Sequence, residues 1–465
     1  MGPCAIILAA GLGTRMKSLT PKVLHTINGK PIVKHVIDAV ETLKPAHIIV
    51  VVGPESNNIR MALKDETVSY AVQKKPKGTA DALKAALHQL DKLKAKYKTV
   101  LVLSGDTPLI NPATLKHLLD LHKSRKEALS ILSFIAHGRH AYGRIIRDGN
   151  NVTGIVEDKN ANAEQKKIAE VNSGIYAIEL NALSLIKYIR MNPLKKEYYL
   201  TDIVTLAARR GCRIGSHMLG DETELTGINT RRELSLAGLY LRDRIVSQLM
   251  DNGVSFINPK TVVIDPAASI GTDTVIYPNV IIEGKSSIGR GCTIYPNCRI
   301  QESKLDDNVT VKDSTVIEFS TIMEGASVGP FAHLRPDSVI GRSAKIGNFV
   351  EIKKSVIGSG SKASHLSYLG DSEIGDNVNI GAGTITCNYD GTHKFKTVIE
   401  ENVFIGSDTQ LVAPVKVGKG AYVGAGSTIT KDVPPVALAV SRSPQRNIEG
   451  WAATKTKTKD KHKPK

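Results

Sequence analysis

The sequence predicts an α/β chain with two parts, a mostly parallel sheet covered by helices and then a parallel β-helix. Short apolar runs alternate with amphipathic helical patterns from residue 4 to about residue 228, which is typical of a mostly parallel sheet. From residue 264 onward, aliphatic residues recur every six positions. A period of six fits neither an α-helix nor an ordinary strand, but it fits the faces of a three-sided parallel β-helix.

The first part contains four continuous apolar runs that indicate buried strands. These runs are Ala5–Leu8, Ile48–Val52, Val100–Leu103 and Leu129–Phe134. Between them lie three segments with one apolar face, which predict helices over Pro31–Leu43, Thr79–Leu90 and Pro112–Leu121. Because ligands of such sheets bind at the carboxyl ends of the strands, we expect a site there.

One long helix is predicted over residues 230–252, between the two parts. Thr230 and Glu233 form a capping box at its start, and Gly253 is placed to end it. We therefore divide the chain into a sheet domain (1–228), a linker helix (229–253), a β-helix domain (254–450) and a basic tail (451–465).

The six-residue ladder has three runs. The first is Ile264, Ile270, Ile276, Ile282, Ile288, Ile294 and Ile300; the second is Val316, Ile322, Val328, Leu334, Ile340, Ile346 and Ile352; the third is Ile399, Ile405, Leu411, Val417, Val423 and Ile429. If each hexapeptide is one face, roughly nine or ten coils result. The ladder breaks between Lys353 and Ile399, and we interpret this break as a functional site.

Composition narrows the class of protein. The chain has 465 residues, 41% hydrophobic and 23% charged, with a net charge of +17 and a pI near 9.5, which favours anionic partners. Residues 455–465 hold six lysines and one aspartate and no apolar side chain, so we expect a disordered tail rather than a docking element. The five cysteines lack zinc-like spacing, and no signal peptide or membrane span is evident, so a cytoplasmic protein with free thiols is expected.

A glycine-rich turn follows the first predicted strand. It reads Leu8-Ala9-Ala10-Gly11-Leu12-Gly13-Thr14-Arg15-Met16, and Pro21-Lys22 comes soon after. Backbone amides of such a turn can approach a polyphosphate, and Arg15 can neutralise it. Two glycines also occur in ordinary strand–helix turns, and the motif is not a Walker loop because no G-K-[ST] follows.

The stretch L-A-A-G-x-G-T-R-M…P-K-V-L resembles the signature of the sugar-nucleotide pyrophosphorylases, whose first domain is Rossmann-like. Further segments follow in the family's order, among them Ser104-Gly105-Asp106 and Gly227-Ile228-Asn229. The resemblance implies Mg²⁺ held by Asp106 and Asn229. It implies UTP and UDP-N-acetylglucosamine bound by Leu8, Ala9, Ala10, Gly11, Arg15, Lys22, Gln73, Gly78, Thr79, Ser104, Asp106, Gly143, Glu157, Asn172 and Asn229. Many family members have lysine where this chain has Leu12, so this site has one charge fewer against the phosphates.

The break in the ladder is rich in polar groups that a solenoid core cannot use. Arg335 lies 18 residues before Lys353, so the two should stack on adjacent coils and could clamp a phosphate. His365 is the one titratable group of the break suited to general base catalysis near neutral pH. A solvated basic face and a structural histidine are the alternative readings of these residues.

The segments around His365 and Asn388 resemble the acetyltransferase half of the bacterial bifunctional enzymes that make UDP-N-acetylglucosamine. The resemblance implies a left-handed β-helix in a homotrimer, with His365 as the general base. It implies glucosamine-1-phosphate bound by Arg335, Lys353, Tyr368, Asn379 and Lys394, and acetyl-CoA bound by Ala382, Asn388, Tyr389, Ser407, Ala425 and Arg442. The acetylated product, N-acetylglucosamine-1-phosphate, would then react with UTP at the first site.

Two other functions compete with this prediction. One is a pyrophosphorylase whose β-helix only regulates or assembles, which the polar residues around His365 disfavour. The other is a basic scaffold for nucleic acid or an anionic envelope, which only the net charge and the lysine tail favour. We therefore expect no nucleic-acid partner.

Overall fold

Two compact units make up the protein, Met1–Ile245 and Val246–Lys465. The computed structural model describes residues 2–11, 13–92, 97–137, 141–193, 195–219 and 221–460. The boundary between the units falls inside the long helix α8 (Arg231–Asp251), which is the helix predicted to link the two parts.

The first unit is built on one mixed sheet, with the strand order β11-β7-β10-β6-β1-β4-β5 and with β8 and β9 at its margin. β1 pairs in parallel with β4 and β6, whereas β10 runs antiparallel between β6 and β7. The predicted, mostly parallel sheet is therefore confirmed. The strands are β1 (Cys4–Leu8), β4 (His47–Val52), β5 (Ser69–Val72), β6 (Thr99–Ser104), β7 (Leu129–Ile135), β8 (Arg144–Asp148), β9 (Asn151–Val156), β10 (Glu170–Glu179) and β11 (Ile214–Met218), with the small hairpin β2 (Thr26–Ile27) and β3 (Lys30–Pro31).

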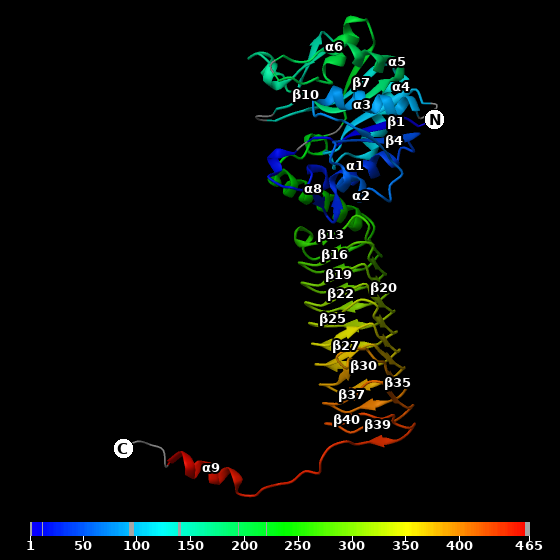
Figure 1. Cartoon of the computed structure of the whole chain (residues 1–465), viewed down its shortest axis with the longest axis vertical. Helices are drawn as coiled ribbons and strands as arrows, with labels where there is room; N and C mark the ends of the chain where they lie inside the picture. The colour runs from blue at the N-terminus through cyan, green and yellow to red at the C-terminus, as the bar shows by residue number, and fades with distance from the viewer. Residues whose placement is uncertain are drawn as a thin grey trace. The chain divides into compact units, whose positions relative to one another are not determined.

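Helices cover both faces of this sheet (Figure 1). Successive residues of β1 point to opposite faces, so Ile6 joins one apolar core while Ala5 and Ile7 join the other. The helices are α1 (Ile32–Glu41), α2 (Asn57–Ala62), α3 (Thr79–Lys92), α4 (Pro112–Ser124), α5 (Leu180–Leu183), α6 (Asp202–Arg209) and α7 (Glu222–Leu225). α3 and α6 pack with the core of Ile6, and α1 and α4 with the core of Ile7.

The start of α8 has the predicted capping box. The amide of Glu233 donates to the Thr230 hydroxyl at 3.2 Å, and the amide of Thr230 donates to the Glu233 carboxylate at 2.9 Å. The same carboxylate accepts from the amide of Asn229 at 2.6 Å. Ala237 and Leu241 of α8 pack with Ile228 and so tie the cap to the sheet domain.

The second unit is a solenoid of short parallel strands in three sheets of 11, 10 and 9 strands. It runs from β12 (Ser255–Phe256) to β41 (Leu438–Ala439), and its strands stack along one axis (Figure 1). Ile264 pairs with Ile282, and Ile282 with Ile300, which is the predicted step of 18 residues. One predicted interior position is wrong: Ile317 rather than Val316 is fully buried, because Ile317 pairs with Ile300 and only five residues separate it from the next interior position, Ile322.

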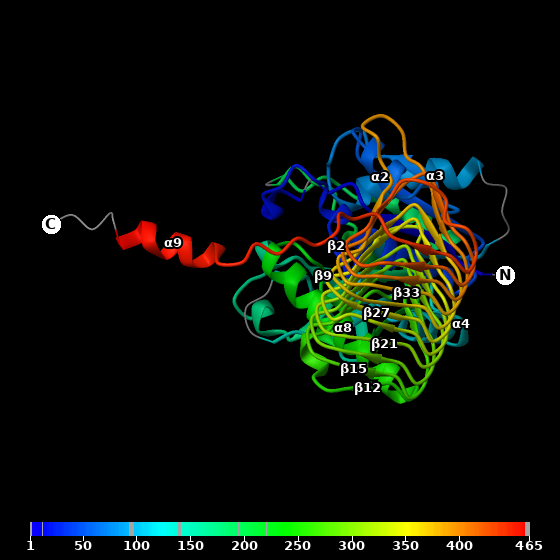
Figure 2. The same ribbon diagram turned by 90° about the horizontal axis from the view of Figure 1, so that it is seen from below.

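The predicted break in the ladder is also corrected by the structure. Ile357, Ala363, Leu369, Ile374 and Ile380 are all buried and continue the interior positions after Ile352. Thr386 takes the next interior position, with its hydroxyl donating to the carbonyl of Gly370 at 3.1 Å. The steps from Ile352 to Ile357 and from Leu369 to Ile374 have five residues, which shifts the six-residue phase, and Ala363 and Thr386 are not large aliphatics. The coils are interrupted only by the loop between β34 (Ile385–Cys387) and β35 (Thr397–Ile399), which projects in orange in Figure 2.

A column of serines runs inside the solenoid, one on each of six successive coils. Its members, here called the serine column, are Ser286, Ser303, Ser320, Ser338, Ser355 and Ser372, and all are buried. The hydroxyl of Ser286 accepts from the amide of Ser303 at 3.2 Å, and that of Ser303 accepts from Ser320 at 3.1 Å. The hydroxyl of Ser355 likewise accepts from the amide of Ser372 at 2.9 Å, so hydrogen bonds of this kind join three pairs of neighbouring coils.

The tail differs from the prediction of disorder. A helix, α9 (Trp451–Asp460), begins it, and residues 461–465 lie outside the described residues. Alanine and lysine favour helix, and the Lys455 ammonium lies 4.6 Å from the centre of the Trp451 ring. None of the helices in the described ranges has the length and apolar character that a membrane span requires.

Candidate active sites

A cavity of about 710 Å³ lies at the edge of the sheet where β1 and β6 end. We call it the strand-edge cavity. Of the residues predicted to bind UTP or UDP-N-acetylglucosamine, those that line it are Leu8, Ala9, Ala10, Gly11, Arg15, Lys22, Gln73, Gly78, Thr79, Ser104, Asp106, Glu157, Asn172 and Asn229. Gly143 is not among the lining residues, and its carbonyl accepts from the amide of Asn172 at 2.8 Å. Leu12 lies outside the described residues.

Asp106 and Asn229 face a common point in this cavity, although 123 residues separate them in the chain. The Lys22 ammonium forms a salt bridge with Asp106 and lies 3.0 Å from the side-chain oxygen of Asn229. The ammonium group thus occupies the position between the two oxygens where a metal cation would bind. Asp106 is further fixed by the Ser104 hydroxyl, which donates to it at 2.5 Å. A carboxylate and an amide oxygen meeting one positive charge fit a hard metal ion such as Mg²⁺.

The glycine-rich turn brings Lys22 to that point. Gly13 has a φ of 62°, and a Cβ there would lie 2.5 Å from the Cβ of Lys22, so only glycine allows this approach. Arg15 follows in a short 3₁₀ helix, Thr14–Met16, and lines the same cavity.

The loop after β5 is held in shape by Gln73 and Gly78. The side-chain amide of Gln73 donates to the carbonyl of Gly78 at 3.1 Å and to Asp81 at 2.9 Å. Gly78 has a φ of 102°, and a Cβ there would lie 2.5 Å from the carbonyl oxygen of Tyr198. Thr79 accepts from the amide of Leu200 at 3.0 Å, so this loop and the 197–201 segment close the cavity together.

The far wall of the cavity holds a buried acid. Glu157 accepts from the Thr201 hydroxyl at 2.9 Å, and burial raises the pKa of its carboxyl group. Asn172 lies next to an irregularity in β10 and donates to the Tyr176 hydroxyl at 2.6 Å. Burial likewise raises the pKa of the Tyr176 phenol.

Tyr176 and Glu197 line the cavity but were not predicted. Tyr176 sits in the apolar strand β10 and has the sequence signal of a core residue. Glu197 follows a run of lysines, where its sequence context indicates a solvated charge. The irregular register of β10, which no local pattern reveals, turns its polar groups into the cavity.

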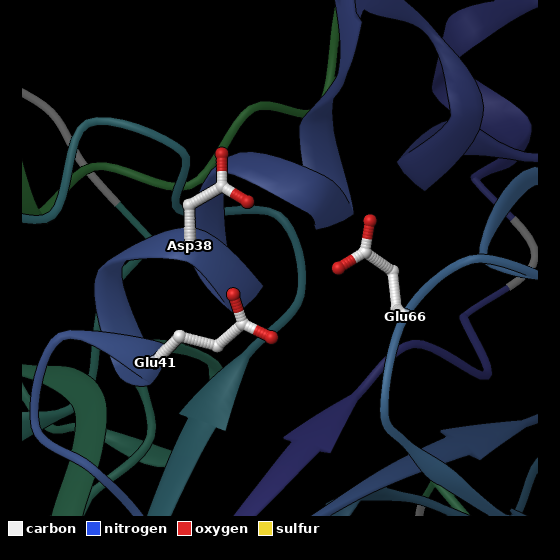
Figure 3. A group of neighbouring side chains, drawn as sticks. All are labelled: Asp38, Glu41 and Glu66. Carbon is white, nitrogen blue, oxygen red and sulfur yellow. The ribbon is translucent and has the colours of Figure 1, made fainter.

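Three carboxylates gather elsewhere in the first unit. Asp38 and Glu41 project from α1 towards Glu66 (Figure 3). Lys30 forms a salt bridge with Asp38, and Lys34 forms one with Glu66. Because these lysines already balance most of the negative charge, the cluster is a surface ion-pair network rather than a metal site.

In the solenoid, two of the cations predicted to bind the sugar phosphate, Arg335 and Lys353, lie on neighbouring coils of one sheet, and Lys394 lies in the loop between β34 and β35. β25 (His333–Leu334), β28 (Glu351–Lys353) and β31 (Tyr368–Gly370) are successive strands of this sheet. Arg335 follows β25 and pairs with Glu351 at 2.8 Å. The pKa of Lys394 is lowered because its amine contacts that of Lys353, so two ammonium groups face one another. This arrangement favours an anion between them.

His365 lies on another sheet, at the end of β30 (Lys362–His365), and its Nδ1 is 2.6 Å from the side-chain oxygen of Asn348. Asn379 begins β33 (Asn379–Ile380), the next strand of that sheet, and pairs with Lys362. Asn379 therefore stands three register positions from His365, and it lies on a different sheet from Lys353 and Tyr368.

Four of the residues predicted to bind acetyl-CoA follow one corner of the coils. The carbonyl of Ala382 accepts from the amide after Ser407 at 2.7 Å, and that of Ser407 accepts from the amide after Ala425 at 2.8 Å. The Arg442 guanidinium donates to the carbonyl of Ala425. The carbonyl of Leu366, next to His365, accepts from the amide after Ala382 at 3.1 Å, so His365 heads this column.

The projecting loop carries Asn388 and Tyr389. The buried Asn388 donates to Asp371 at 2.5 Å, which ties the loop to the preceding coil. Tyr389 is exposed and donates to the carbonyl of Gly391. Asp390 accepts from the amides of Thr392 and His393, and these hydrogen bonds lower the pKa of its carboxyl group.

Both halves of the chain match known families. Residues 5–148 match the MobA-like NTP transferase domain, residues 258–335 match the GMPPB C-terminal domain, and residues 319–354 and 396–431 match the bacterial transferase hexapeptide repeats. The bifunctional protein GlmU of Thermodesulfovibrio yellowstonii is 53% identical over 97% of this chain and 99% of its own length. The GlmU proteins of Heliobacterium modesticaldum and Syntrophotalea carbinolica are each 47% identical, over 97% and 96% of this chain and 98% and 96% of theirs.

These matches span the strand-edge cavity and the left-handed β-helix alike. The chain belongs to the family of bifunctional GlmU proteins.

Proposed function

We propose that this protein is a cytoplasmic enzyme that catalyses two consecutive reactions. The solenoid transfers an acetyl group from acetyl-CoA to glucosamine-1-phosphate, and the first unit then transfers a uridylyl group from UTP to N-acetylglucosamine-1-phosphate. The products are UDP-N-acetylglucosamine and pyrophosphate. The observation that carries the proposal is 53% identity to a bifunctional relative over 97% of the chain, which includes both candidate sites.

At the strand-edge cavity, a phosphate oxygen of the sugar phosphate attacks the α-phosphorus of UTP, and the bond to the pyrophosphate breaks. Arg15 and Lys22 neutralise the phosphates and align them for this displacement. Asp106 and Asn229 would hold Mg²⁺, which supplies further neutralisation of the transferred phosphate. Lys22, which bridges the same two oxygens, would then turn its ammonium to the phosphates.

The other lining residues bind the base and the sugar. Gln73, Gly78 and Thr79 present side-chain and backbone groups to uracil. Glu157 and Asn172, beside Gly143, bind the sugar hydroxyls and the acetamido group. Because Glu157 is buried and hydrogen-bonded to Thr201, it presents its remaining acceptor in a fixed direction.

At the solenoid, Nε2 of His365 takes a proton from the sugar ammonium, and the free amine attacks the thioester carbonyl of acetyl-CoA. The C–S bond then breaks, and the departing sulfur takes up the second proton of the attacking nitrogen, so that CoA leaves as the thiol. Arg335, Lys353 and Lys394 bind the sugar phosphate with Tyr368 and Asn379. Ala382, Ser407, Ala425 and Arg442 follow the CoA chain, and the loop of Asn388 and Tyr389 bounds the acetyl group.

We propose a homotrimer as the working assembly. Asn379 begins its strand and His365 ends the neighbouring one, so the two side chains are separated within one copy. A second copy could bring its own Asn379 to the His365 of the first. Phe331, Phe349 and Leu366 also form an exposed apolar column beside His365, which contact with a second copy would bury.

Two single variants test the assignment of both activities. His365→Ala should lower the rate of CoA release with glucosamine-1-phosphate by about 10²- to 10⁴-fold and leave pyrophosphate release from UTP unchanged. Asp106→Ala should lower the rate of pyrophosphate release from UTP and leave CoA release unchanged. It should also weaken Mn²⁺ binding, measured by electron paramagnetic resonance. If the unsubstituted protein released no CoA, the β-helix would be only an assembly element, and the first unit a pyrophosphorylase alone.

A further inference from the structure

Two strands of the solenoid are longer than the others, and they meet at His365. β27 (Lys345–Asn348) and β30 (Lys362–His365) have four residues each, whereas the other described strands from β12 to β41 have two or three. Their pairing begins at Lys345 and Lys362 and extends to Asn348 and His365. Residues paired in adjacent parallel strands project to the same side, so the extra length carries Asn348 next to His365.

The contact between the two side chains selects one form of the imidazole. The side-chain oxygen of Asn348 lies 2.6 Å from Nδ1 of His365, and a carbonyl oxygen can only accept. With the amide in this orientation, Nδ1 carries the proton and Nε2 keeps the lone pair that a general base needs. The hydrogen bond also restricts rotation of the ring.

The backbone holds Asn348 in this position. Its carbonyl accepts from the amide of Leu366 at 3.0 Å, immediately after His365. At Gly347, a Cβ would lie 1.9 Å from the carbonyl oxygen of Ser364, so the coils approach closely only because this residue is glycine. Phe349 and Leu366, which follow the two strands, both have a positive φ (56° and 49°), so both coils turn in the same way after Asn348 and His365.

We propose that Asn348 is a positioning residue for acetyl transfer: it holds His365 with Nδ1 protonated and Nε2 directed at the sugar amine. The inference rests on the proposed acetyltransferase function and extends it to a residue outside the substrate contacts assigned above. The side-chain amide of Asn348 can accept the hydrogen bond from Nδ1, and it adds no charge beside the basic residues assigned to the sugar phosphate.

Steady-state kinetics of Asn348→Ala test this role. We expect kcat for acetyl transfer to fall about 10- to 100-fold, with the KM values for glucosamine-1-phosphate and acetyl-CoA unchanged. Asn348→Asp, which keeps an acceptor in the same place, should restore most of kcat. The ¹⁵N shifts of the His365 ring should indicate Nδ1 protonation in the unsubstituted protein and a tautomer mixture in Asn348→Ala. Lys345→Ala, on the same strand, is the matched control and should change none of these quantities.

Each remaining outcome is decisive. An unchanged kcat in Asn348→Ala overturns the positioning role, and a raised KM with unchanged kcat makes Asn348 a substrate contact instead. Uridylyl transfer by the same preparation reports whether the variant is folded. Absence of acetyl transfer in the unsubstituted protein would defeat the proposed function itself, not only this inference.

Discussion

Glu157 illustrates how one buried side chain in a candidate site affects stability. Its carboxyl group lines the strand-edge cavity and accepts a hydrogen bond from Thr201. Burial is the largest cause of its raised pKa, and the negative charge of Asp202 adds to it. The folded protein thus favours the protonated acid, whereas the unfolded chain ionises it freely. The stability that protonation contributes is fully present below the unfolded pKa and is lost as the pH rises through the folded pKa.

Glu157→Gln should therefore raise the free energy of unfolding at about pH 8, and the gain should vanish towards about pH 4. The glutamine keeps the acceptor for Thr201 but never ionises. Urea midpoints at both pH values measure the effect. Glu164→Gln, at an exposed position, is the matched control. A gain that did not depend on pH would contradict the explanation by ionisation.

The sequence predicted the residues of both sites largely by resemblance rather than by local pattern. Asp106 and Asn229 belong to segments far apart in the chain, and only their separate motifs indicated a shared metal site. Asn348 carried no such motif. Its importance depends on the register of β27 and β30, and register is set by the packing of whole coils, which a single sequence does not display.

At the scale of the element, the cap of α8 does more than start a helix. Glu233 accepts from the amides of both Thr230 and Asn229, so the cap also fixes the residue that faces Asp106. Thr230→Ala removes the hydroxyl that accepts from the amide of Glu233. It should lower the free energy of unfolding by about 1 kcal/mol, measured by urea denaturation. Thr230→Ser keeps the hydroxyl and should retain nearly the full free energy of unfolding. Equal losses in both variants would show that the methyl group of Thr230 matters instead.

The elements show where pattern reasoning succeeded and where it failed. The strands near Ile6, Val50 and Val102 were predicted because each is a continuous apolar run buried on both faces. The solenoid was predicted from its six-residue period. The predicted break was wrong because two five-residue steps shift the phase of the repeat, and because Ala363 and Thr386 fill interior positions without being large aliphatics. Small residues fit where the coils approach closely, and a hydroxyl fits where a backbone group can pair with it.

At the scale of the whole chain, the tail adds charge but no core. In the described part of the tail, residues 451–455 are exposed, and so is Ile448 just before it. A protein ending at Thr454 should therefore keep both activities within about twofold, because Arg442 and every residue assigned to the two sites remain. Parallel assays of CoA and pyrophosphate release check this. Selective loss of acetyl transfer would mean that the tail covers the residues assigned to CoA.

The serine column has a consequence for how the solenoid reaches its correct register. Parallel coils with similar aliphatic interiors could slide past one another and still bury comparable apolar surface. A slip of one residue, however, would turn these hydroxyls and the amides they serve away from their partners, at about 1–3 kcal/mol for each group left unpaired inside. Each misaligned coil in a folding intermediate is thus destabilised, which favours the correct register of the solenoid as the chain folds.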